Sequence, residues 1–410
     1  MKSALRFAGV TLGALLALPA HAREGDTFSP FVSYGWFYDS NLFRLADSEQ
    51  PGFPRDDRYS ILSAGLNMDW KPGRQQIIAN ATKTWVRYDR NTMFDSEGRD
   101  YLGTWNWRLG NHLSGNVGAG QNLSQSGFDN VGRVNNMVTR DRRFGRAKWQ
   151  FHPRWGIEGG VDEADYSNSA PSLSSQDANQ QARDAILRYT TPKGSKLGFQ
   201  VRRTDAEFPN LQCLSPFFGI CLEVADNSFK QTEYNLLGDW ALSGKLKLHG
   251  QAGWVDRQYE NTMRNTYPYT PALKQRPDFS GFAGRLSADW YATAKTLLNV
   301  TMYQELGGAA DINASSVLKR GAGINGVWLM REKWRMNVGA TYLNRDFKGD
   351  PGTTQTQRND DTVAASLSVS YMPIQMMSLD VGVSAGRRDS NMPADDYKFH
   401  SVFANIRADF

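Results

Sequence analysis

The sequence has few cysteines, few histidines and, after its first segment, no long apolar run. Without an apolar stretch of about 20 residues, helices that span a membrane are excluded. The two cysteines, Cys213 and Cys221, allow at most one disulfide. The five histidines are scattered, and no metalloprotease, serine-hydrolase, dithiol or phosphate-loop motif occurs. We therefore expect no catalytic residues, no metal site and no cofactor.

The first 22 residues read as a secretory signal peptide. Lys2 and Arg6 supply the basic start, residues 7–18 form a short apolar stretch, and residues 20–22 (AHA) form a small-residue cleavage site after Pro19. An apolar stretch this short does not span a bilayer. We predict a signal peptide at 1–22 and a single folded unit at 23–410. Export to an oxidising compartment also predicts a disulfide between Cys213 and Cys221.

The composition combines low mean hydropathy (−0.55) with many aromatic residues and glycines. The chain holds 12 Trp, 16 Tyr, 21 Phe and 38 Gly. In a membrane β-barrel only every second strand residue faces lipid, so no single segment looks hydrophobic. A secreted β-sandwich also has many short strands, and composition alone leaves both open. The net charge of +5 is mild, and we expect no nucleic-acid partner.

Connections of two kinds alternate strictly along the chain. The short kind is rich in Pro, Gly, Lys or Ser and occurs at 71–73, 110–112, 152–153, 192–194, 243–244, 292–294, 331–333 and 373–374. The long, polar kind occurs at 39–57, 91–98, 125–139, 167–180, 209–228, 261–276, 307–315, 349–359 and 389–395. Eight short and nine long connections separate eighteen strands. An even count with two-sided asymmetry predicts an all-β, antiparallel up-and-down barrel with short periplasmic turns and long extracellular loops.

The segments between these connections alternate between apolar and polar residues. In 62–70, for example, Leu62, Leu66 and Trp70 share one face, and Asn67 and Asp69 share the other. The same pattern occurs in 246–254, 363–371 and 379–385, whereas 77–86 and 316–330 are too irregular to fix a register. This alternation is typical of strands with one lipid face and one aqueous face.

Aromatic residues stand beside nearly all the short turns. They are Trp70, Trp107, Trp149, Phe151, Trp155, Tyr189, Trp240, Trp290, Tyr291, Trp328, Trp334 and Tyr371. Such rings prefer the interface between membrane and water, so we predict a girdle at the periplasmic end. The last strand alternates to Phe410, a terminus that resembles the signal read by the barrel-assembly machinery. We therefore expect the outer membrane, its lipids and that machinery as location and partners.

Extending the strand registers places charges of both signs on the inner face. The basic residues that we expect to line the lumen include Arg108, Arg146, Lys148, Arg188, Arg202, Arg285 and Arg335. Cross-strand ion pairs that brace the wall are one interpretation. The other is a polar conduit that favours anionic or hydroxyl-rich solutes, and the two are compatible. His249 and His400 also fall on faces that we interpret as polar. A hidden catalytic dyad is one interpretation, but ordinary lumen histidines fit better because no paired spacing occurs.

The segment Asp26 to Asp47 (DTFSPFVSYGWFYDSNLFRLAD) adds a family resemblance. Its core comprises Tyr38, Asp39, Ser40, Asn41, Leu42, Phe43, Arg44 and Leu45. It resembles the start of the EpsL-like proteins, outer-membrane barrels associated with exopolysaccharide biosynthesis clusters in exosortase-bearing bacteria. At position 40 the family tends to have a second acid. The resemblance implies a role in exopolysaccharide export, with the polymer and periplasmic export proteins as partners, and implies no catalytic residues.

The sequence therefore leads us to expect an eighteen-stranded barrel that assists exopolysaccharide export across the outer membrane. One alternative is a general diffusion porin for small hydrophilic solutes. The long loops are moderate in size, and none is an obvious constriction loop, which counts against that alternative. A barrel enzyme acting on lipid or polysaccharide is the second alternative.

Overall fold

The computed structural model describes residues 27–49, 51–213, 216–217, 220–221, 223–259, 264–265, 278–307, 314–349 and 357–410. The predicted signal peptide at 1–22 lies outside these residues and stays a prediction. Among the described residues, no helix is long and apolar enough to cross a bilayer.

Eighteen long strands make up the main sheet. They are β1 (Phe28–Asp39), β2 (Asp57–Trp70), β3 (Gln76–Tyr88), β4 (Ser96–Leu109), β5 (Leu113–Gln125), β6 (Met137–His152), β7 (Trp155–Asn168), β8 (Ala178–Thr190), β9 (Lys196–Glu207), β14 (Phe229–Ala241), β15 (Leu246–Tyr259), β17 (Phe279–Thr293), β18 (Thr296–Gly307), β19 (Ala314–Arg331), β20 (Trp334–Gly349), β21 (Asn359–Ile374), β22 (Met377–Ser390) and β23 (Tyr397–Asp409).

The remaining elements lie in the long connections. They are the helix α1 (Phe128–Val131), the 3-10 turns η2 (Thr92–Phe94), η3 (Pro171–Gln176) and η4 (Pro393–Asp395), and the short strands β10 (Gln212–Cys213), β11 (Pro216–Phe217), β12 (Ile220–Cys221), β13 (Glu223–Ala225) and β16 (Arg264–Asn265).

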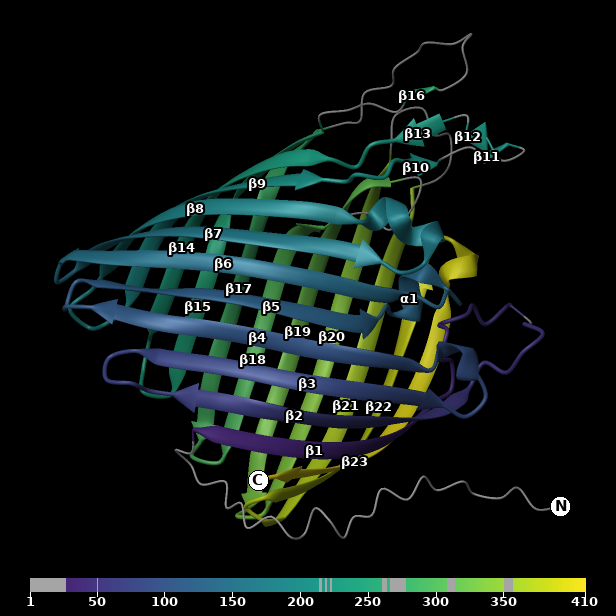
Figure 1. Ribbon diagram of the computed structural model, residues 1–410, viewed down its shortest axis with the longest axis horizontal. Coiled ribbons are helices and arrows are strands. Elements are labelled where there is room, and N and C mark those ends of the chain that lie inside the picture. Colours follow the sequence, from purple (N-terminus) through teal and green to yellow (C-terminus); the bar gives the residue numbers. More distant parts are fainter. Residues whose placement is uncertain are drawn as a thin grey trace.

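The main sheet closes on itself as an antiparallel up-and-down barrel (Figure 1). Each long strand pairs with the next one along the chain, and β23 pairs with β1 from Asp409↔Phe31 to Ser401↔Asp39. The backbone amide of Phe410 donates to Pro30 O at 2.8 Å, which extends this seam by one residue. Closure leaves no unpaired edge, which is the requirement for a sheet in hydrocarbon. The predicted fold and strand count are confirmed.

The period-2 pattern explains how the strands divide their side chains between two faces. Paired residues share a face, so the register carries the pattern around the ring. The outward face is apolar and open to the surroundings, with Trp70 48 % and Trp254 52 % exposed. The inward face is polar, as at the pairs Asn67↔Asn80 and Asp239↔His249. The segments 77–86 and 316–330 now have a defined register within β3 and β19.

The two ends of the barrel differ as predicted. The eight short turns lie at the end that carries Phe410, and the long connections lie at the other end (Figure 1). Gly73, Gly110 and Gly194 have positive φ in three of the short turns, a conformation that a residue with a Cβ adopts at a cost. This asymmetry is that of outer-membrane barrels, with short turns in the periplasm and long loops outside.

The predicted aromatic residues surround the short-turn end, and most of them face outward. Trp149, Trp155 and Trp334, among others, face outward and are exposed. Tyr291 instead faces the interior, where Lys247 Nζ lies 5.5 Å from the centroid of its ring. Its neighbour Trp290 takes the outward position, because side chains alternate along β17.

The long connection between β9 and β14 carries both cysteines. Cys213 is disulfide-bonded. The side chain of Cys221 lies outside the described residues, so the predicted bond between these two cysteines stays a prediction.

Candidate functional site: the barrel interior and its mouth

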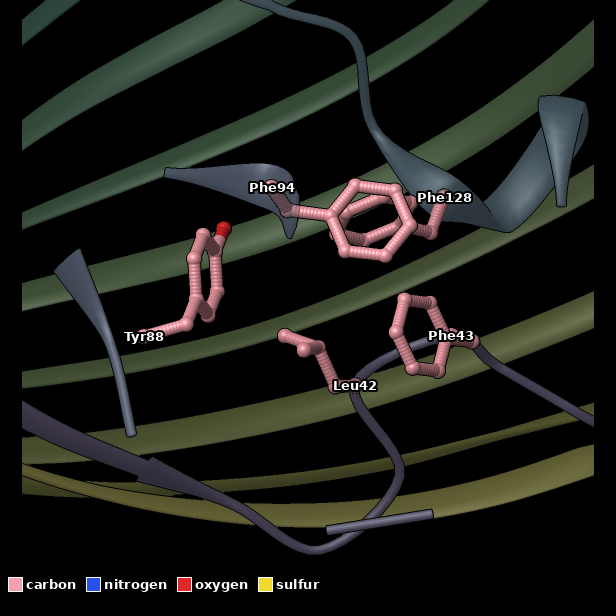
Figure 2. Packing of buried hydrophobic residues seen from close by; sticks show 5 residues of the cluster. All are labelled: Leu42, Phe43, Tyr88, Phe94 and Phe128. Atoms are coloured by element: carbon pink, nitrogen blue, oxygen red, sulfur yellow. The ribbon is translucent and has the colours of Figure 1, made fainter. Parts of the chain in front are cut away.

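Three long loops meet inside the extracellular mouth and form a hydrophobic cluster, which we call the mouth cluster. It consists of Leu42 and Phe43 from the β1–β2 loop, Tyr88 from β3, Phe94 from η2 and Phe128 from α1 (Figure 2). The ring centroid of Phe43 lies 5.3 Å from that of Phe94 and 4.9 Å from that of Phe128. Phe94 is fully buried and Phe43 is 1 % exposed. Rings at these separations and inclinations pack favourably, so the cluster holds the three loops together.

The motif recognised in the sequence forms the base of this cluster. Arg44 reaches back to Asp39 through two hydrogen bonds, Nη1 to Oδ1 at 2.8 Å and Nη2 to Oδ2 at 2.9 Å. Its guanidinium also lies 4.0 Å from the centroid of the Phe399 ring on β23. Arg44 has a φ of 56°, a left-handed conformation that is unfavourable for a residue with a side chain. The bidentate pair offsets this cost and fixes the direction of the loop.

Asn41 ties the same turn to the barrel wall. Its side-chain amide donates to Leu45 O at 2.9 Å and to Lys398 O at 3.0 Å, and its Oδ1 accepts from the Leu45 amide. Asn41 is only 3 % exposed, and these hydrogen bonds supply partners for the polar atoms of its buried side chain. The turn therefore delivers Leu42 and Phe43 into the mouth cluster, whereas Tyr38 faces outward beside His400.

The loop between β5 and β6 reaches across the mouth to a distant part of the wall. Arg388 of β22 donates from Nη1 to Asp129 O at 3.1 Å, and its Nη2 lies 3.5 Å from Asp129 Oδ2. Arg388 faces the interior and is 3 % exposed. The loop therefore folds inward at the mouth, which its moderate length in the sequence does not reveal. Inside the mouth Phe128 is buried against Phe43 and Phe94, and Asp129 meets a cation on β22.

Arg388 belongs to a group of buried charges at the same level. Asp360 of β21 is fully buried and accepts from Arg358 at 2.7 Å, while Arg345 Nη2 lies 3.1 Å from its Oδ2. Arg358 also pairs with Asp395 of η4 at 3.0 Å. A buried carboxylate without cations is very costly, so the three arginines stabilise Asp360 in its ionised form. Together, three arginines and three aspartates form a buried ion-pair network beside the mouth cluster.

A second network of charges runs around the interior nearer the periplasmic end. Arg146 of β6 lies 3.8 Å from Glu158 of β7, and Arg188 of β8 donates to Glu158 at 2.9 Å. Arg188 Nη1 lies 3.6 Å from Asp239 of β14, which contacts His249 of β15 at 2.8 Å. We call this alternating series the charge ladder. It links strands from β6 to β15 and continues to Asp289 of β17, 3.6 Å from His249 Nε2.

A glycine on β7 allows Arg146, at the start of the charge ladder, to reach a second acid on β8. Arg146 also donates to Asp184 of β8 at 2.6 Å, passing over β7 at Gly160. A Cβ on Gly160 would lie 2.6 Å from Arg146 Nη2 and 2.8 Å from Asp184 Oδ1. Only glycine leaves room for a guanidinium at this point of the wall.

The structure places all seven predicted basic residues on the interior face. Arg146, Arg188 and Arg285 form ion pairs, the last with Glu305 at 3.3 Å. Four others form no ion pair with any residue that the structure describes, namely Arg108, Lys148, Arg202 and Arg335. The interior therefore combines bracing pairs with cations that remain available to a solute, and the role of these residues in transport stays a proposal.

Neither His249 nor His400 forms a catalytic dyad with a described residue. His400 pairs with Ala385 on the outward face of β23, so its assignment to a polar inner face is wrong. His249 is hydrogen-bonded to Asp239 in the charge ladder, and within the described part of the chain no serine hydroxyl bonds to it. In this structure His249 therefore links Asp239 and Asp289 on the barrel wall.

The chain matches a known family over nearly its whole length. The model of the family described as "Putative beta-barrel porin 2" matches residues 26–410. No curated protein matches the chain.

The similar solved structures share little sequence identity with this chain. OpdK of Pseudomonas aeruginosa with vanillate is 9 % identical, with a TM-score of 0.48 over 93 % of this chain and 99 % of that one. OccAB3 of Acinetobacter baumannii is 8 % identical, with a TM-score of 0.48 over 93 % and 99 %. A BenF-like porin from Pseudomonas fluorescens Pf-5 is 8 % identical, with a TM-score of 0.49 over 94 % and 99 %. From the family match, the chain belongs to this β-barrel porin family of the outer membrane.

Proposed function

We propose that this barrel is a diffusion channel for small hydrophilic solutes, with a preference for anions. The observation that carries the proposal is the bridge from Asp129 to Arg388, which holds the β5–β6 loop inside the mouth. A mouth narrowed by a packed loop limits passage to small molecules.

The preference for anions follows from how the interior charges are compensated. The acids of the charge ladder, Glu158, Asp239 and Asp289, each contact a basic partner. Arg108 and Lys148, in contrast, form no ion pair among the described residues. Uncompensated cations on a channel wall attract anions and disfavour cations.

Liposome swelling tests the proposal. Purified protein in liposomes should admit monosaccharides and sugar acids and exclude oligosaccharides beyond a defined size, with a faster rate for anionic than for neutral solutes of equal size. Equal uptake of short and long oligosaccharides would contradict a narrowed mouth, and no uptake of any solute would refute the channel.

Exopolysaccharide export is a second candidate, favoured by the segment from Tyr38 to Arg44. This segment resembles the EpsL-like proteins and builds the base of the mouth cluster, so a contact with an emerging polymer is a role that its position would serve. Deleting the gene should then abolish surface polysaccharide, and replacing Phe43 with Ala should alter its export. Unchanged polymer in the deletion strain would exclude this candidate.

A further inference from the structure

A pocket of about 360 Å³ opens on the interior wall near the periplasmic end, away from the mouth cluster. Its wall is built by neighbouring strands from β3 to β7. Its lining includes Asn106, Arg108, Ser114, Asn116, Arg146 and Lys148, together with the carboxylate of Glu158. This volume is in the lower part of the range of small-molecule sites, and it matches a ligand of monosaccharide size.

The strand registers arrange these side chains as two adjacent rows. In the first row Arg108 pairs with Ser114, and Ser114 pairs with Lys148. In the second row Asn106 pairs with Asn116. Because neighbouring strands are about 4.8 Å apart, the Cα atoms of Arg108 and Lys148 lie roughly 10 Å apart across β5. Two cations thus flank a neutral centre of hydroxyl and amide groups.

The charge of the pocket is not neutralised by the wall. Glu158, an acid at its edge, is shared by Arg146 at 3.8 Å and Arg188 at 2.9 Å. Arg146 is further compensated by Asp184 at 2.6 Å. The charge ladder therefore engages both nearby acids, Glu158 and Asp184. Lys148 pairs in register with Glu158, but neither Lys148 nor Arg108 forms an ion pair with a described residue.

The geometry points to a binding site for a sugar acid, a carboxylate of monosaccharide size that carries hydroxyls. Arg108 takes the carboxylate through its planar fork of donors, and Lys148 adds a second positive charge. Asn106, Asn116 and Ser114 donate to and accept from the hydroxyls. A lone inorganic anion would use the cations but leave the neutral groups between them unused. The inference rests on the proposed channel function and adds to it the class of solute.

Isothermal titration calorimetry on the full protein in detergent tests the site with glucuronate, glucose and inorganic phosphate as probes. The variant Arg108→Gln/Lys148→Gln should bind glucuronate at least tenfold more weakly than the wild type. The matched control Arg202→Gln/Lys247→Gln removes the same charge from interior positions outside the pocket and should bind normally. Heat-modifiable migration on gels verifies that each variant is folded. If the double variant Arg108→Gln/Lys148→Gln does not fold, the single variant Arg108→Gln is measured in its place.

The outcomes separate the site from the channel. Weak binding confined to the pocket variant supports the site, even in a barrel that shows no solute flux in liposomes. Equal affinity in the wild type and the pocket variant, or equal weakening in both variants, would overturn it. Phosphate that binds as tightly as glucuronate would also overturn it, because the neutral groups would then contribute nothing.

Discussion

Replacing Phe43 with Ala should release the loops of the mouth while leaving the barrel folded. Phe43 is 1 % exposed and packs against the rings of Phe53, Phe94 and Phe128. The Arg133 guanidinium also lies 5.4 Å from the centroid of its ring. None of these contacts belongs to the strand pairing that closes the barrel, so the substitution should destabilise the docked loops and not the barrel.

The size of this effect on loop docking follows from the burial of Phe43 and from its ring contacts. Truncating a buried Phe to Ala costs about 3–5 kcal/mol in a packed core. Each of the three ring pairs contributes about 0.5–1.5 kcal/mol of that total. Since about 1.4 kcal/mol is a factor of ten, the equilibrium between docked and released loops should shift by roughly two to three and a half powers of ten.

Hydrogen exchange of the purified protein measures this shift. Amides in residues 40–49, 89–95 and 126–136 should exchange much faster in Phe43→Ala, while β-strand amides keep their protection. Phe151→Ala is the matched control, since it removes an outward-facing ring at the opposite end of the barrel. Unchanged exchange in all three loops of Phe43→Ala would refute the reasoning that the mouth cluster holds them.

Three further predictions follow from single contacts. Arg388→Gln removes the cation that holds the loop 126–136, so this loop should become cleavable by added protease while the strands stay resistant; a loop that remains resistant would contradict the bridge. Gly160→Ala should displace the Arg146 guanidinium and lower stability by about 1–3 kcal/mol, measured as an earlier loss of heat-modifiable folding. Cys213→Ser should destabilise the β9–β14 loop by under about 3 kcal/mol without affecting barrel closure, and labelling of Cys213 in unreduced wild-type protein would contradict a disulfide.

The barrel was predictable from the sequence because its strands follow one local rule. Alternation along 62–70 assigned Asn67 and Asp69 to the interior, and extending such registers placed Arg146 and Arg188 there as well. The alternation of short and long connections gave the strand count and the direction of the chain. Each of these signals spans a few residues, so it is readable without knowing the partners in space.

The mouth was not predictable in the same way, because its contacts join residues that are distant in the sequence. Asp129 and Arg388 are 259 positions apart, and no periodicity links them. Phe94 and Phe128 stand in the long irregular connections, where a buried ring and an exposed one have the same sequence pattern. The error at His400 is smaller. It is an error of one position in the alternation, which moves the side chain to the opposite face of the strand.

Single-channel recording in planar bilayers tests the central claim most directly. With purified protein and a gradient of potassium chloride, we predict discrete current steps and a reversal potential of the sign that reports preferred chloride passage. The expectation rests on interior cations such as Arg108 and Lys148, which form no ion pair among the described residues. Bilayers that contain folded protein and show no steps, or a reversal potential that reports preferred potassium passage, would contradict the account.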